Sequence, residues 1–170
     1  ISKPKNNVAW NDIFFSDENN LENFRYNNLN QIIFKSRKLS NRIVDDYLLF
    51  ENGNLITSDK KGNIIIISIK EKKIINKFNF YKKKYKRYKK KLNIFIEDNI
   101  IYVSDNIGYL YALDYQQDKV LWAVNYQIPF KSNLKIINDK IISSDINNNL
   151  IFFDKNNGEL LQLFPTENTE

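Results

Sequence analysis

Short apolar segments alternate with polar turns along the whole chain, and the alternation repeats. Four times an apolar segment ends in a Ser-Asp dipeptide, and successive Asp residues lie 42, 46 and 40 positions apart. They are Asp17, Asp59, Asp105 and Asp145. The third residue after each Asp is Gly or Asn, which tolerate the positive φ of a tight turn. The Asp carboxylate can accept backbone N–H bonds in such a turn.

Each repeat is consistent with four strands joined by polar turns. The segments 64–68, 109–114 and 150–154 are rich in Ile, Leu, Phe and Tyr, as strand propensity requires. The runs IIII and YLYAL are apolar on both faces, which predicts strands sandwiched between neighbouring sheets. Four antiparallel strands in 40 to 46 residues are typical of a β-propeller blade. We predict an all-β propeller region, 1–170, with four blades at about 5–36, 45–81, 92–127 and 133–165.

The third repeat carries a motif at residues 112–122. This motif resembles the tryptophan-docking motif of quinoprotein-type (PQQ-like) propellers, whose pattern is A-x-D-x-x-T-G-K-x-x-W. The matching residues are Ala112, Asp114, Lys119 and Trp122. Gln117 and Asp118 replace the usual Thr-Gly, and the last repeat keeps Gly158 but has Gln162 in place of Trp.

The resemblance implies a structural role for these residues. In that family the Trp packs between blades, and the turn residues tie neighbouring blades together. Repetition supports the same interpretation independently, because a catalytic carboxylate is needed once whereas this Asp recurs in every repeat. The predicted structural blade motif consists of Asp17, Asp59, Asp105, Asp145, Gly62, Gly108, Ala112, Asp114, Lys119, Trp122 and Gly158.

The quinoprotein-type family has two functional groups. Quinone-dependent dehydrogenases hold a PQQ cofactor and calcium in the ring centre, whereas cofactor-free scaffolds, such as the outer-membrane β-barrel assembly lipoprotein, bind partner proteins. The chain has no Cys and therefore lacks the vicinal Cys pair common beneath the cofactor in the alcohol dehydrogenases. We expect a non-catalytic scaffold that binds a protein partner and has no cofactor, no metal and no catalytic residue. A fragment of a PQQ-dependent dehydrogenase is the alternative.

The resemblance also implies a location in the periplasm or at the periphery of the outer membrane. The chain begins with Ile1 and contains neither a hydrophobic leader nor a lipidation Cys, so we expect an excised or processed segment. Propellers of this type usually have seven or eight blades. Because an open arc of four blades would expose apolar faces, we expect part of a longer ring or a half-ring that self-associates.

The composition excludes several other classes of function. Without Cys or His the chain can form no disulfide, no His-ligated metal site and no Ser-His triad. The longest aliphatic run, residues 64–67, is too short to span a membrane. Nothing in the spacing of the carboxylates singles out the pair that a glycosidase needs.

The net charge of +6 comes from one short segment. Residues 82–91 read KKKYKRYKKK, and the rest of the chain carries 18 basic against 20 acidic residues. A dedicated nucleic-acid binder usually spreads its basic residues over a face, so we do not expect nucleic acid as the partner.

We interpret residues 82–91 as a basic inter-blade loop that is either simply solvated or a contact for an anionic partner or a peripheral membrane surface. The candidate contacts are Lys82, Lys83, Lys84, Lys86, Arg87, Lys89, Lys90 and Lys91.

Overall fold

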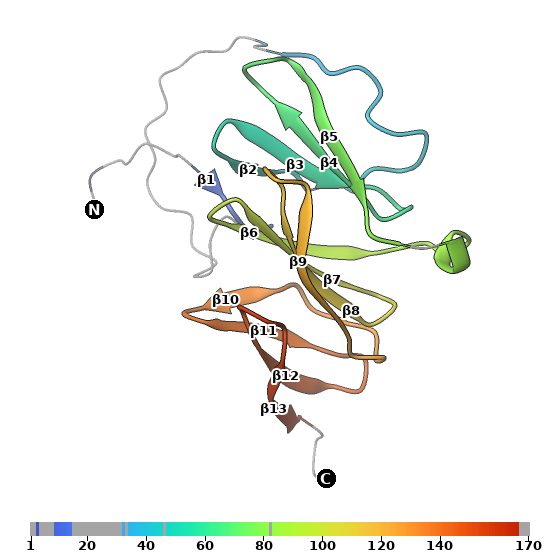
Figure 1. Cartoon of the computed structure of the whole chain (residues 1–170), viewed down its shortest axis with the longest axis vertical. Coiled ribbons are helices and arrows are strands. Elements are labelled where there is room, and N and C mark those ends of the chain that lie inside the picture. Colours follow the sequence, from blue (N-terminus) through green and yellow to red (C-terminus); the bar gives the residue numbers. More distant parts are fainter. Residues whose placement is uncertain are drawn as a thin grey trace. The chain divides into compact units, whose positions relative to one another are not determined.

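The computed structural model describes residues 3, 9–14, 32, 34–45, 47–81 and 83–166. This part of the chain contains thirteen β-strands in three antiparallel sheets and one short 3-10 helix, η1 (Lys83–Tyr85) (Figure 1). The predicted all-β class is therefore confirmed. The chain divides into two compact units, unit 1 at residues 1–89 and unit 2 at residues 90–170. Within the described ranges, no helix has the length and apolar character needed to cross a membrane.

Unit 1 contains one sheet with the strand order β1-β2-β3-β4-β5. Its strands are β1 (Ala9–Trp10), β2 (Leu49–Glu51), β3 (Asn54–Ser58), β4 (Asn63–Ser68) and β5 (Lys73–Asn79). The inner strand β4 carries the run of four isoleucines, and each is at most 3% exposed. Both faces of β4 are therefore buried.

Most of the predicted first blade, 5–36, lies outside the described residues, and Asp17 lies there too. Of its described residues, 9 and 10 form β1, which pairs antiparallel with β2. In the structure these two residues therefore extend the sheet of the second repeat by a fifth strand.

Unit 2 contains two sheets, each of four strands in sequence order. The first consists of β6 (Leu92–Glu97), β7 (Ile100–Asp105), β8 (Tyr109–Asp114) and β9 (Lys119–Asn125). The second consists of β10 (Lys135–Ile137), β11 (Lys140–Ser144), β12 (Asn149–Asp154) and β13 (Leu160–Pro165). Each strand pairs antiparallel with the next, so each of these two sheets is a meander of three hairpins.

Tight turns close the first hairpin of two sheets where the sequence places Asn, Asp or Gly. Between β2 and β3, Asn52 has a φ of 48° and Gly53 a φ of 76°. Between β6 and β7, Asp98 and Asn99 have φ values of 52° and 67°. Positive φ at both central residues is the signature of the type I′ turn, whose twist matches that of the flanking strands.

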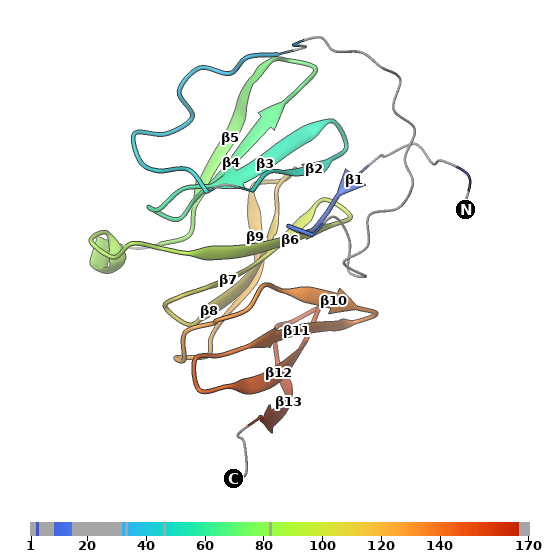
Figure 2. The same cartoon turned by 180° about the vertical axis from the view of Figure 1, so that it is seen from behind.

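One hydrophobic core joins the two sheets of unit 2. Tyr102, Leu110 and Ala112 belong to the face of the β6–β9 sheet that contributes to this core, and Ile151 and Phe153 belong to the face of the β10–β13 sheet. Figures 1 and 2 show the two sheets lying beside each other from both sides. One face of each sheet is thereby covered by its neighbour.

Candidate functional site

The repeated Asp side chains are embedded in the turns that they begin. The Oδ1 atom of Asp105 accepts hydrogen bonds from the backbone N–H groups of Ile107, Gly108 and Tyr109, at 2.8, 2.8 and 2.9 Å. Asp59 and Asp145 accept equivalent bonds from the second and fourth residues after them. All three carboxylates are fully buried. Their acceptor atoms are therefore engaged by the fold.

Additional donors stabilise two of these carboxylates in the ionised form. Burial raises the pKa of Asp59, but hydrogen bonds from Ser40 and Asn63 outweigh this effect and leave the pKa below its usual value. Burial acts in the same direction on Asp145, and bonds from Asn149 and Tyr126 likewise lower its pKa.

The hydroxyl of Tyr126 donates to Asp145 over 2.9 Å. Burial, together with this bond, raises the pKa of Tyr126 to about 12. Tyr126 follows β9 and Asp145 follows β11, so the bond links the two sheets of unit 2. In the described part of the chain, no three His, Cys, Asp or Glu side chains come together as a metal site.

Trp122 also links the two sheets of unit 2. Its Nε1 atom donates a hydrogen bond to the backbone carbonyl of Lys155 over 3.1 Å. Its ring lies against Gly158, where a Cβ atom would come within 2.5 Å of the indole. The ammonium of Lys155 lies 2.7 Å from the carboxylate of Glu97. These contacts join β6 and β9 of one sheet to the turn between β12 and β13 of the next.

The other predicted motif residues lie in or near the turns of their repeats. Ala112 is fully buried and pairs with Trp122 across the strands, while Asp114 accepts backbone bonds from the two turn residues that follow Tyr115. Lys119 is exposed at the start of β9. The remaining two are glycines with positive φ in the Asp turns, Gly62 at 82° and Gly108 at 100°.

The second face of the β10–β13 sheet, opposite the shared core, is the open sheet face. The strand register places ten side chains on this face, of which Ile142, Leu150, Phe152 and Phe164 form its apolar part; the others are Lys135, Ile137, Lys140, Ser144, Asp154 and Gln162. Leu150 is 36% and Phe164 48% exposed. The rings of Phe152 and Phe164 meet edge to face, with their centroids 5.7 Å apart.

The neighbouring sheet carries the same face in a covered state. Residues 40 positions before Ile142, Leu150 and Phe152 are at most 3% exposed, because the β10–β13 sheet packs on them. Leu110, the counterpart of Leu150, is fully buried. This face is therefore covered by the next sheet in the β6–β9 sheet, whereas in the β10–β13 sheet it is exposed to solvent.

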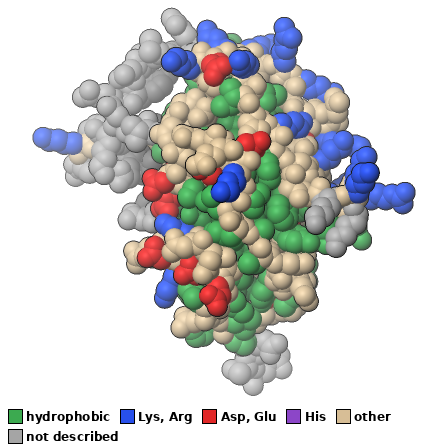
Figure 3. All heavy atoms as spheres, in the orientation of Figure 1, with side chains coloured by type: hydrophobic (Ala, Val, Ile, Leu, Met, Phe, Trp, Pro, Cys, Tyr) green, Lys and Arg blue, Asp and Glu red, His purple; other side chains and the backbone are tan. Residues whose placement is uncertain are grey.

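The predicted basic loop is ordered by a chain of aromatic contacts. Successive ring centroids from Phe80 through Tyr81 and Tyr85 to Tyr88 lie 5.6, 6.5 and 6.2 Å apart. Backbone bonds from Lys86 and Tyr88 to residues three positions earlier close two consecutive turns around η1. Figure 3 shows Lys and Arg side chains at its right-hand edge, where the same view in Figure 1 places η1.

The predicted cations of this segment divide between the two units. Lys83, Lys86, Arg87 and Lys89 belong to unit 1 and are exposed, whereas Lys90 and Lys91 begin unit 2. Lys90 is only 2% exposed, so it is not a surface contact, whereas Lys91 is exposed. Lys82 and the side chain of Lys84 lie outside the described part of the chain.

A basic pocket of about 690 Å³ lies in unit 1, beside this segment. Its cationic lining consists of Arg42, Lys60, Lys61, Lys86, Arg87 and Lys89. Ile43 and Tyr88 also line it, and they are 73% and 62% exposed. No described carboxylate lines the pocket, although Asp45 forms an ion pair with Lys60.

Three of the pocket's cations escaped the sequence prediction. Arg42, Lys60 and Lys61 lie 20 or more positions before the basic loop, and only folding brings them beside it. A signal was nevertheless present, because Lys60 and Lys61 follow the repeated Asp directly. The corresponding positions of the next two repeats hold only uncharged side chains.

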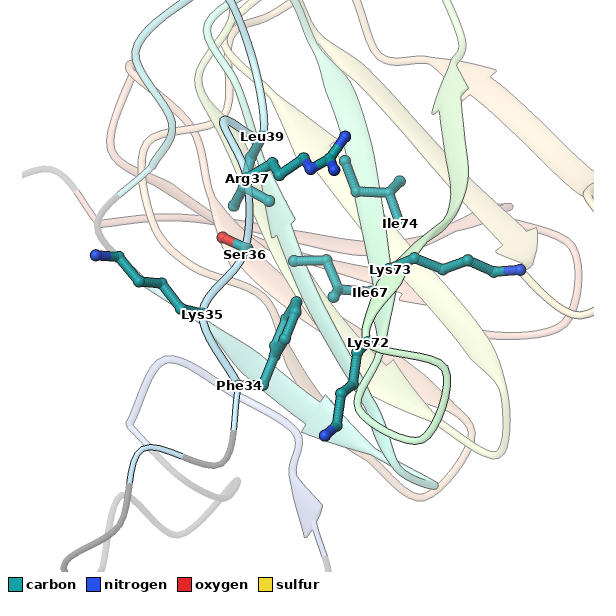
Figure 4. A pocket seen from close by; sticks show the side chains of 9 residues that line it. All are labelled: Phe34, Lys35, Ser36, Arg37, Leu39, Ile67, Lys72, Lys73 and Ile74. Carbon is teal, nitrogen blue, oxygen red and sulfur yellow. The ribbon is translucent and has the colours of Figure 1, made fainter.

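A second pocket of unit 1, of about 440 Å³, lies between residues 34–39 and the β4–β5 hairpin. Phe34, Leu39, Ile67 and Ile74 supply its apolar lining. Figure 4 shows the ammonium group of Lys35 pointing away from this pocket. The arrangement is that of an extended segment laid over a sheet, and four cations, Lys35, Arg37, Lys72 and Lys73, also line the space between them.

Comparison with known proteins identifies the fold. No family model matches the chain, and no curated protein matches it. Quinohemoprotein alcohol dehydrogenase from Comamonas testosteroni is similar in structure, with a TM-score of 0.71 and 14% identity over 92% of this chain and 27% of that one. BamB from Moraxella catarrhalis gives a TM-score of 0.54 and 13% identity, over 66% of this chain and 33% of that one. The computationally designed protein Ika4 gives 0.67 and 13%, over 84% of both chains.

At these identities the similarities concern the fold alone. They support the predicted PQQ-like propeller fold, present here as part of a propeller. The chain spans about a third of the length of BamB and about a quarter of the dehydrogenase.

Proposed function

We propose that this protein is a non-catalytic propeller scaffold that binds protein through the open sheet face. The observation that carries the proposal is the exposure of Leu150 and Phe164. The equivalent face of the β6–β9 sheet is covered by the sheet of the next repeat, so the open sheet face is one on which a further sheet could pack. The three described Asp residues of the repeat support the non-catalytic part, since each carboxylate accepts backbone bonds within its own turn. A general acid or base would need such a group free to reach a substrate.

The partner that we propose for this face is a second copy of the chain. In unit 2 the equivalent surface packs on the opposite face of the next sheet, which carries Ile141, Ile151 and Phe153. A second copy would instead present its own open sheet face, for a two-fold contact between two identical apolar faces. Full burial of a Leu or Phe side chain stabilises by about 1.5–3 kcal/mol. Burying the remaining exposed parts of Leu150 and Phe164 on both copies would therefore contribute a few kcal/mol to association.

Charge substitution on the open sheet face tests the proposal. We expect the wild-type chain to form dimers in sedimentation equilibrium and the Leu150→Arg/Phe164→Arg variant to dimerise at least tenfold more weakly. Ile146→Arg is the matched control, because Ile146 is 54% exposed but lies in the turn between β11 and β12. Circular dichroism should show that all three proteins are folded. A wild-type chain that stays monomeric, or equal weakening by Ile146→Arg, would overturn the proposed interface.

A fragment of a PQQ-dependent dehydrogenase is the second candidate, favoured by the structural similarity to a quinohemoprotein alcohol dehydrogenase over most of this chain. Titration with the quinone and calcium distinguishes the two functions. The scaffold should give no saturable binding of the quinone in the presence of calcium, whereas a dehydrogenase fragment that retains its site should give a defined stoichiometry. We also propose a location in the periplasm or at the periphery of the outer membrane, as the resemblance to assembly lipoproteins implies.

A further inference from the structure

The basic pocket of unit 1 is a site that the scaffold function does not use. We propose that it binds the phosphate head groups of an anionic phospholipid surface and so attaches the protein peripherally to a membrane. Six cations from three separate chain segments, 41–43, 60–61 and 86–89, converge on one hollow of about 690 Å³. Clusters of four to eight Lys or Arg are typical of surfaces that bind anionic lipids.

Most of this positive charge is not engaged by the fold. Four exposed cations of the pocket form neither hydrogen bonds nor ion pairs with other described residues through their side chains; they are Arg42, Lys61, Lys86 and Arg87. Lys60 differs from them, because it pairs with Asp45. Such a concentration of like charge is unfavourable in itself, and phosphate groups would relieve the repulsion.

Two apolar side chains lie among these cations and favour a lipid surface over other polyanions. Ile43 is 73% exposed and Tyr88 is 62% exposed. Stable peripheral attachment requires apolar insertion together with electrostatic attraction, and tyrosine is enriched at the membrane–water interface. A single-stranded nucleic acid would use aromatic rings for stacking, but an exposed isoleucine contributes nothing comparable to its binding.

The cations near Tyr88 are held on an ordered support. The ring contacts from Phe80 to Tyr88 and the backbone bonds around η1 fix the course of the segment that carries Lys86 and Arg87. Preorganised charges lose less conformational freedom on binding than those of a mobile tail. The pocket is therefore better suited to head groups than an unstructured basic run of equal charge.

Vesicle co-sedimentation of the whole chain tests this site. We expect binding to vesicles that contain phosphatidylglycerol, weakening as salt rises, and little binding to vesicles of phosphatidylcholine alone. Each neutralised cation should weaken binding roughly fivefold. Lys86→Gln/Arg87→Gln and Arg42→Gln/Lys61→Gln should therefore each lower the affinity by about 25-fold. Lys70→Gln/Lys140→Gln removes the same charge from exposed positions outside the pocket and should have a clearly smaller effect.

Two further measurements separate a lipid surface from other anions. Ile43→Ser/Tyr88→Ser should weaken binding to vesicles, while inorganic phosphate at matched ionic strength should compete no better than chloride. The proposal is overturned if the control variant weakens binding as much as the pocket variants, or if Ile43→Ser/Tyr88→Ser has no effect. Effective competition by free phosphate would instead assign the pocket to a small anion. Tight binding of a single-stranded oligonucleotide without vesicle binding would assign it to nucleic acid.

Discussion

Gly158→Ala tests the contact between the two sheets of unit 2. An added Cβ would lie 2.5 and 2.6 Å from Cζ3 and Cε3 of Trp122, and 3.2 Å from Val124. The indole cannot move away freely, because its Nε1 atom is bonded to the carbonyl of Lys155. Overpacking of this kind costs about 1–3 kcal/mol. The φ of 75° adds about 1–2 kcal/mol for any residue with a Cβ. The expected loss of unfolding free energy is therefore about 2–5 kcal/mol.

Gly53→Ala supplies the matched control for this substitution. Gly53 has nearly the same φ, 76°, but nothing lies within 4 Å of its added Cβ. This variant should lose only the backbone contribution, about 1–2 kcal/mol. Chemical denaturation followed by circular dichroism and by tryptophan fluorescence measures both losses. Equal losses for the two variants would refute the packing of Trp122 on Gly158. A second check is Trp122→Ala, in whose background Gly158→Ala should cost no more than Gly53→Ala.

Two further predictions concern the Asp turns. Asp105→Ala leaves three backbone N–H groups near a buried position without their carboxylate acceptor, so it should lower the free energy of unfolding by about 2–4 kcal/mol. Asp114→Ala, in a more exposed turn, should lower it by only about 1 kcal/mol. Chemical denaturation measures both losses, and similar values would contradict the burial argument. The pKa of Asp145 is lowered from 3.8, so its stabilising effect is fully present above pH 3.8 and is lost as the pH falls through the lowered pKa. Thermal unfolding across this range should show a falling Tm, with a shallower fall in Asp145→Asn, and an equally steep fall in this variant would exclude Asp145 as a contributor.

The fold could be predicted from the sequence because several local signals agree. The Ser-Asp dipeptides mark the ends of β3, β7 and β11, and the isoleucine run of β4 has no polar side to expose. Turn residues with positive φ, such as Asn52 and Gly53, occur where the hairpins close. Each of these signals involves residues close together in the chain, so no knowledge of tertiary contacts was needed to interpret them.

The candidate surfaces were only partly predictable, because they depend on residues far apart in the chain. The basic run 82–91 indicated an anion contact, but the contribution of Arg42 and Lys61 follows from how unit 1 folds. Lys90 is equivalent to its neighbours in the sequence, yet in the structure it is buried and Lys91 beside it is exposed. For the open sheet face, the apolar residues of β12 indicated only a strand. Which of its two faces is covered depends on the sheet that packs beside it.

Site-specific cross-linking tests the central claim, that the open sheet face binds a second copy, most directly. The chain contains no Cys, so a single introduced Cys reports on one position only. Leu150→Cys and Phe164→Cys should give covalent dimers with a bifunctional thiol reagent long enough to span the face, because a two-fold contact places the two copies of this face against each other. Ile146→Cys, more accessible than either position but outside the face, should remain monomeric. Equal dimer yields at all three positions, or no dimer at Leu150 and Phe164, would contradict the account.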